Sequence, residues 1–176
     1  MNGRPPEAAA SPPDLAALEA WALDRNLLLR LRAGRRLGIW GLQVAVARPL
    51  GPGRAQLLGE LKGWAYPGRS GLQLDTMRVQ GQDTALVGPL IWAATFAWAL
   101  EATPCRRALL LAIRDHEAQH RRLVRYFRQL GFSPLRELGA GVADFAPRLI
   151  WGGAGLLMRA DCTEVLRRSG RRLGLG

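Results

Sequence analysis

The two histidines of the chain stand four residues apart in an HExxH pattern, His116 to His120. On a helix, this spacing puts both histidines on one face, where they can bind zinc while the glutamate acts as a base. Asp115 and the arginines around the pattern argue against that use, because clustered guanidinium groups repel a divalent cation. We therefore expect no metal here, and expect Asp115 to cap a helix that starts at the motif. A third ligand would have to be a carboxylate such as Glu137, Asp144 or Glu164.

The same segment continues into a run of arginines that could bind phosphate groups. They are expected on the wet face of the helix, and they are Arg121, Arg122, Arg125 and Arg128. The formal net charge of the chain is +11, which favours anionic partners. However, Lys62 is the only lysine, and such a preference for arginine can also reflect the codon composition of the gene. The sequence contains no RNP-like aromatic strand, helix-turn-helix or zinc knuckle. Non-specific binding of RNA or of an acidic protein complex therefore stays open as a use of this face, whereas sequence-specific recognition is not supported.

Length and composition predict one folded globular domain, and exclude a disordered chain and a fibrous repeat. The chain has 176 residues, of which 48% are hydrophobic and 22% charged. Its two cysteines form no CxxC pair, which excludes a disulfide framework and a cysteine zinc site. The longest apolar run, 85–100, is interrupted by Gly88 and Pro89 and is shorter than the ~20 residues that span a bilayer. We expect a cytoplasmic protein without a secretory signal or transmembrane segment.

Four strands in a meander are predicted for the first half of the domain. A Pro/Ala-rich flexible tail (1–13) precedes Asp14, which is expected to cap a short helix. Alternating apolar residues then predict strands at 27–32, 40–46, 56–66 and 72–79, with a turn at 34–38. In the fourth strand the apolar residues change parity after Leu74, which predicts a β-bulge near Asp75 or Thr76. A strand buried on both faces would explain the same pattern.

The second half alternates helices with strands. An apolar helix is predicted at 86–101, a central parallel strand at 108–113, and a helix at 115–130 that Gly131 ends. Strands at 134–138 and 148–158 complete a single domain, 14–160, before a basic C-terminal tail, 161–176. The fold class is therefore α+β, with a mixed and mostly antiparallel sheet, a central parallel pair and flanking helices.

This order of elements resembles the GNAT superfamily of acyl-CoA N-acyltransferases. The similarity is most specific at the strand 108–114 and the segment 123–132, where Phe127 to Phe132 has the spacing of a Tyr-x-x-x-Gly-Phe motif. The resemblance implies that the fourth strand splays from the fifth and that the pantetheine arm of acetyl-CoA, or of another acyl-CoA, lies in the gap. The residues that it places against this substrate are Met77, Val79, Leu86, Val87, Gly88 and Phe127.

The chain departs from the family pattern at several of these positions. Asp83 and Leu86 replace residues that favour pyrophosphate, and Phe127 replaces the tyrosine that commonly acts as general acid. The candidates for catalysis are therefore the adjacent Tyr126, about 100° away around the helix, and Asp75 as the base for the amine. Two functions stay open: acyl transfer from acyl-CoA to an unidentified amine, or a catalytically silent GNAT-like module that docks on RNA or an acidic complex.

Overall fold

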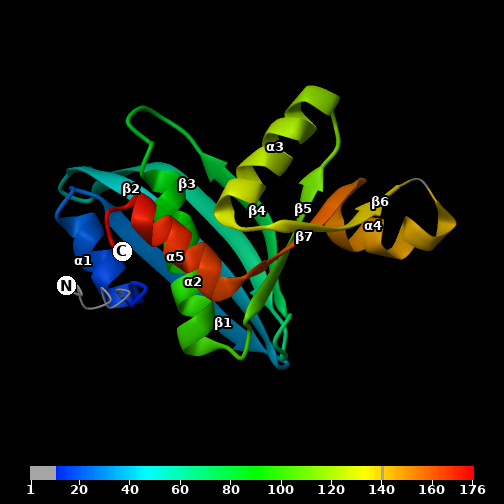
Figure 1. The fold of residues 1–176 in the computed structure, drawn as a ribbon. Helices are drawn as coiled ribbons and strands as arrows, with labels where there is room; N and C mark the ends of the chain where they lie inside the picture. The colour runs from blue at the N-terminus through cyan, green and yellow to red at the C-terminus, as the bar shows by residue number, and fades with distance from the viewer. Residues whose placement is uncertain (1–10, 140) are drawn as a thin grey trace, which may run out of the picture.

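A seven-stranded mixed sheet in the order β1-β2-β3-β4-β5-β7-β6 organises the computed structural model, which describes residues 11–139 and 141–176 (Figure 1). The strands are β1 (Leu28–Arg36), β2 (Ile39–Gly51), β3 (Arg54–Ala65), β4 (Leu72–Val79), β5 (Arg107–Ile113), β6 (Ser133–Leu138) and β7 (Gly155–Asp161). The helices are α1 (Leu15–Leu23), α2 (Val87–Ala102), α3 (Glu117–Leu130), α4 (Phe145–Trp151) and α5 (Cys162–Arg172), with a 3₁₀ turn at Val142–Asp144. Within the described sheet, β4 and β5 are the one parallel pair, so the predicted α+β class with a mixed, mostly antiparallel sheet is confirmed.

The meander β1 to β4 turns alternate side chains towards the helices. Leu42, Val44 and Val46 of β2 are buried, whereas Gln43 between them is only half-buried. The first hairpin is tighter than the predicted turn at 34–38, because β1 runs on to Arg36 and only Leu37 and Gly38 (φ 51° and 82°) make the turn. Each of these strands is therefore held in register by its apolar face and by a short connection.

The predicted bulge lies in β4, at Asp75. Lys62 of β3 is opposite Thr76, but the next residue, Gly63, is opposite Leu74, so Asp75 is the extra residue. The parallel pairing of β4 with β5 covers only Leu72–Leu74 against Ala108–Leu110. Beyond the bulge, these two strands have no paired residues in the described sheet. A gap between β4 and β5 is the direct result.

Helix α2 packs on β2, β3 and β4 and is buried on nearly all sides, and its Trp92 lines the gap. Its alanines allow close approach to the strands, and its large aromatic residues fill the core. Trp92 and Phe96 pack with Phe127 and Phe132, with ring centroids about 6 Å apart. The aromatic cluster joins α2 to α3 and to the start of β6. No helix among the described residues is both long enough and apolar enough to cross a bilayer.

The C-terminal third differs from the prediction in two places. The segment predicted as a strand at 148–158 begins inside helix α4, which Gly152 ends with a φ of 77°, and β7 begins only at Gly155. A short apolar run is compatible with either structure, and the two adjacent glycines separate them here. The predicted basic tail, 161–176, is also wrong. Its residues form the end of β7 and helix α5, which packs on α2 and buries Val165, Leu166 and other side chains.

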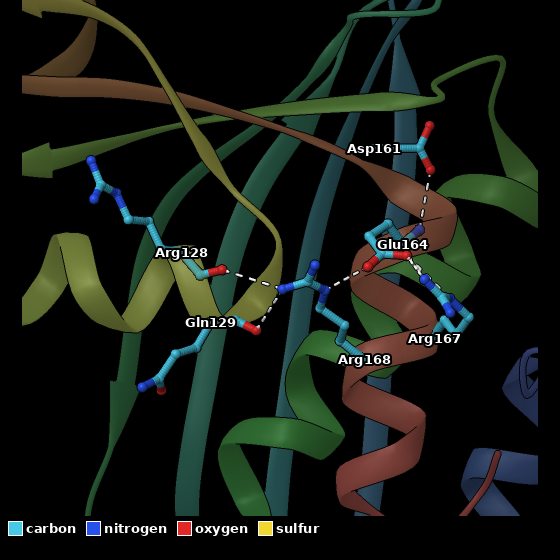
Figure 2. A network of polar contacts seen from close by, with 6 residues as sticks. All are labelled: Arg128, Gln129, Asp161, Glu164, Arg167 and Arg168. Carbon is cyan, nitrogen blue, oxygen red and sulfur yellow. Dashed lines mark hydrogen bonds and ion pairs between the residues drawn. The ribbon is translucent and has the colours of Figure 1, made fainter.

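The C-terminal helix α5 also fixes the end of α3, as Figure 2 shows. Arg168 donates hydrogen bonds to the backbone oxygens of Arg128 (3.4 Å) and Gln129 (3.3 Å) in the last turn of α3, where carbonyls lack the partners of the helix interior. The Arg128 oxygen also accepts from the Gly131 N–H at 3.1 Å. Glu164 holds Arg168 and Arg167 in ion pairs, while Asp161 accepts from the Glu164 amide at 3.1 Å. Gly131, with a φ of 108°, ends α3 as predicted. The position of α3 therefore depends on this polar network.

We expect Glu164→Gln to make folding less sensitive to acid. Hydrogen bonds from Arg167, and then Arg168, hold the pKa of Glu164 below its ordinary 4.5. The carboxylate therefore contributes its full stability above that pH, and the contribution is lost as the pH falls through the folded-state pKa. Urea unfolding from neutral pH to below 4.5 measures this as a smaller fall in the free energy of unfolding.

Glu117→Gln is the matched control for this variant. Glu117 is also on a helix and pairs with an arginine four residues on, but at 3.6 Å and with both side chains more than half exposed. It should leave the acid dependence at the wild-type level. If Glu164→Gln does the same, the network in Figure 2 has no part in stability.

Candidate functional site

The gap between β4 and β5 is lined by residues that the sequence singles out. Asp75, Thr76 and Met77 of β4 line this gap together with Leu110 and Leu111 of β5. Trp92 of α2 and Phe127 of α3 also belong to the lining. The space that remains is about 60 Å³. Of the predicted residues, Asp75, Met77 and Phe127 are therefore brought together at one place.

Tyr126 packs against Trp92 and Phe127, which line this gap, without being part of the lining itself. We call the place where Tyr126, Gly88 and Met77 approach one another the mouth of the gap. Its hydroxyl accepts a hydrogen bond of 2.7 Å from Nε1 of the buried Trp92. A Cβ placed on Gly88 would lie 3.7 Å from both this hydroxyl and Cε of Met77, so α2, α3 and β4 meet here. Burial raises the pKa of Tyr126 above its ordinary 10.0, although the hydrogen bond from Trp92 and the charge of Arg172 oppose the effect. The phenol is therefore protonated at neutral pH, and its own O–H is free to donate.

The N-terminus of α2 offers few backbone donors to a ligand. The Val87 amide donates to the oxygen of Thr84 at 3.0 Å, and Pro89 has no N–H. Of the first three positions of α2, which are all described, this leaves Gly88 as the one with an N–H that has no intramolecular acceptor. The preceding loop is strained at Asp83 (φ 55°), whose oxygen accepts from Arg48 at 3.5 Å.

A larger hollow of about 630 Å³ runs along α3 beside Tyr126. It is lined by His116, Ala118, Gln119, Arg122, Leu123 and Tyr126. This hollow is not among the sites predicted from the sequence. Its signal is the helical spacing of Gln119, Arg122 and Tyr126, which puts the three side chains on one side of α3. The hollow brings a guanidinium group to the same mouth as the Tyr126 hydroxyl.

Three other predicted site residues lie outside this meeting point. Val79 is exposed and pairs with Gly59, two residues further along β4 than Met77. Leu86 precedes α2 as its N-cap and is 40% exposed, without a side-chain hydrogen bond to the helix. Val87 is buried, with its side chain packed over Gly59 in the core. Only the backbone of Val87 is therefore close to the mouth of the gap.

The sequence has no match among protein-family models, and no curated protein matches it. The resemblance to the GNAT acyltransferases therefore stays a prediction. What supports a function is the geometry itself: a bulged strand, a parallel pair that separates, and a tyrosine at the opening. These features come from three separate elements, so their meeting is a property of the fold.

The HExxH pattern is divided by the start of α3. His116 is the exposed N-cap in an extended conformation, so Asp115 does not cap the helix as predicted. His120, inside the helix, is buried, and its Nδ1 lies 3.2 Å from the oxygen of Ile113. Of the two histidines, only His120 therefore belongs to the regular helix. The described residues hold no group of three His, Cys, Asp or Glu side chains suited to a metal ion.

Proposed function

We propose that this protein is an N-acyltransferase that moves an acetyl group from acetyl-CoA to an amine. The observation that carries the proposal is the separation of β4 from β5 at the Asp75 bulge, with Tyr126 and the start of α2 at its mouth. The backbone of β4 beyond the bulge, at Met77 and Val79, lacks a partner on the β5 side. A pantetheine arm has amide groups that would pair with this strand edge.

The side chains at the gap supply both proton transfers of the reaction. The amine nitrogen attacks the thioester carbonyl carbon, a C–N bond forms, and the C–S bond breaks. The departing thiolate takes the proton of the Tyr126 hydroxyl, whose oxygen is held by Trp92. The proton that leaves the attacking nitrogen passes to the carboxylate of Asp75, directly or through water. Tyr126 thus acts as acid and Asp75 as base.

The size of the gap bears on the acyl group. Met77, Trp92 and Phe127 leave about 60 Å³ between the strands, which suits an acetyl group better than a long acyl chain. The 630 Å³ hollow along α3 has room for the rest of the molecule, and Arg122 brings positive charge to it.

Calorimetry with acetyl-CoA tests the proposal, with CoA and inorganic phosphate as comparisons. We expect micromolar binding that Gly88→Glu weakens at least tenfold, because the new carboxylate would stand beside Met77 and Tyr126. Gly34→Glu is the matched control, since a Cβ there meets nothing within 4 Å. Absence of saturable binding in a folded sample would rule out the enzyme.

A second function, a catalytically silent binding module, is favoured by a specific observation. The start of α2 has Asp83, Leu86 and Pro89 around the free Gly88 amide, which is a poor cradle for pyrophosphate. The exposed arginines of α3 would then dock on RNA or an acidic protein complex. These arginines are Arg121, Arg122, Arg125 and Arg128. Binding of an RNA oligonucleotide without binding of acetyl-CoA would support this function instead.

A further inference from the structure

The arginines of α3 divide between two hollows. Arg122 lines the hollow beside Tyr126, whereas Arg121, Arg125 and Arg128 line a second one of about 400 Å³. Successive helical residues turn by about 100°, so Val124, in the wall of the second hollow, projects about 160° away from Tyr126. The two hollows therefore lie on different sides of α3.

The second hollow combines an apolar wall with a buried histidine. Val124 and Leu156 of β7 supply the apolar part, and Arg114 joins the arginines of α3 at the rim. His120 is only 5% exposed. Its Nε2 lies 3.5 Å from Nη2 of Arg114, which can only donate, so Nδ1 carries the proton and donates to the oxygen of Ile113 at 3.2 Å. His120 thus helps to hold the Arg114 guanidinium at the hollow.

The positive charge of this hollow is poorly compensated. Glu117 is the one carboxylate in its lining and lies 3.6 Å from Arg121, and Glu137 outside it pairs with Arg114 at 3.1 Å. Among the described residues, no carboxylate lies within 4.0 Å of the guanidinium nitrogens of Arg125 or Arg128. Four guanidinium groups therefore surround one hollow, with the exposed carboxylate of Glu117 among them and that of Glu137 outside it, a pattern suited to a compact polyanion.

We propose that this hollow binds a nucleoside diphosphate or triphosphate. Its volume is within the range of small-ligand sites, and the arginines match phosphate oxygens in geometry and charge. The flat base would lie on Val124 and Leu156. A single-stranded nucleic acid fits less well, because its charge is spread out and the lining holds no Trp, Tyr or Phe side chain on which successive bases could stack, while the one imidazole, His120, is only 5% exposed.

Calorimetric titration with ADP and with ATP at constant salt tests the site. We expect saturable binding that Arg125→Glu and Arg128→Glu each weaken at least tenfold. Arg122→Glu is the matched control, with the same charge reversal on the same helix but in the other hollow, and it should change the Kd by less than about twofold. Thermal melts of the three variants establish that each one is folded.

Because CoA itself contains an ADP unit, the titration includes a variant of the other site. ADP binding that Gly88→Glu abolishes and Arg125→Glu leaves unchanged would put the nucleotide beside α2 and overturn the proposal. No saturable binding of ADP or ATP, equal loss in Arg122→Glu, or binding of an RNA oligonucleotide alone would overturn it as well. The acetyl-CoA binding that Gly88→Glu removes should persist in Arg125→Glu, so the two proposals fail independently.

Discussion

We expect Tyr126→Phe to lower kcat for acetyl transfer by about two orders of magnitude, with little change in the KM for acetyl-CoA. The variant keeps the ring, which packs against Trp92 and Phe127, and removes only the hydroxyl. Without that proton donor the thiolate leaves unprotonated, which raises the barrier for C–S cleavage but leaves the binding contacts in place. Steady-state kinetics with acetyl-CoA and an amine acceptor measure the effect.

The raised pKa of Tyr126 gives this prediction a second measurement. Because the phenol stays protonated beyond its ordinary 10.0, wild-type activity should not fall through loss of the acid until the pH is above that value. The other tyrosine, Tyr66, is partly exposed, and Tyr66→Phe is the control that should keep wild-type kcat. Equal kcat values in the wild type and Tyr126→Phe would remove Tyr126 from the mechanism and leave Asp75 and water as the proton carriers.

The sequence predicts well those features that depend on local backbone geometry. A change in side-chain parity along 72–79 requires an inserted residue, and the bulge is at Asp75. Gly131 ends α3 because a left-handed residue is needed there. The helix α5 was predicted as a tail because its arginines hide the helical spacing of Cys162, Val165, Leu166 and Ser169, all of which are buried against the body of the protein.

The candidate site was predictable only in part, because some of its residues are far apart in the sequence and meet only in the folded protein. Asp75 and Met77 are marked by the bulge, and Phe127 by its motif spacing. The pair formed by Trp92 and Tyr126 has no local signal, because the two residues are 34 positions apart and meet only when α2 and α3 pack together. The division of the arginines between two hollows likewise has no local signal. It depends on Leu156 of β7, which lines one of the hollows together with residues of α3 and is far from them in the sequence.

The largest expected change in stability comes from Trp92→Ala, which should lower the free energy of unfolding by about 3–5 kcal/mol. Trp92 is 1% exposed and is the common neighbour of four aromatic rings. Their centroids lie 6.1 to 6.5 Å away, and they belong to Phe96, Tyr126, Phe127 and Phe132. Its removal would leave a cavity between α2 and α3 and take the hydrogen bond from the Tyr126 hydroxyl.

Denaturant unfolding at neutral pH measures this loss, and Trp64→Ala is its matched control. Trp64 is 50% exposed on β3, so its removal should cost about 1 kcal/mol or less. If Trp92→Ala does not fold, Trp92→Phe keeps a ring in the core and lacks only the larger indole and its N–H. It should then cost about 1–3 kcal/mol, because the Tyr126 oxygen loses its buried donor.

A loss in Trp92→Ala no larger than in Trp64→Ala would mean that the aromatic cluster does not hold α3 in place. The position of Tyr126 would then have to depend on the polar contacts of α5 alone.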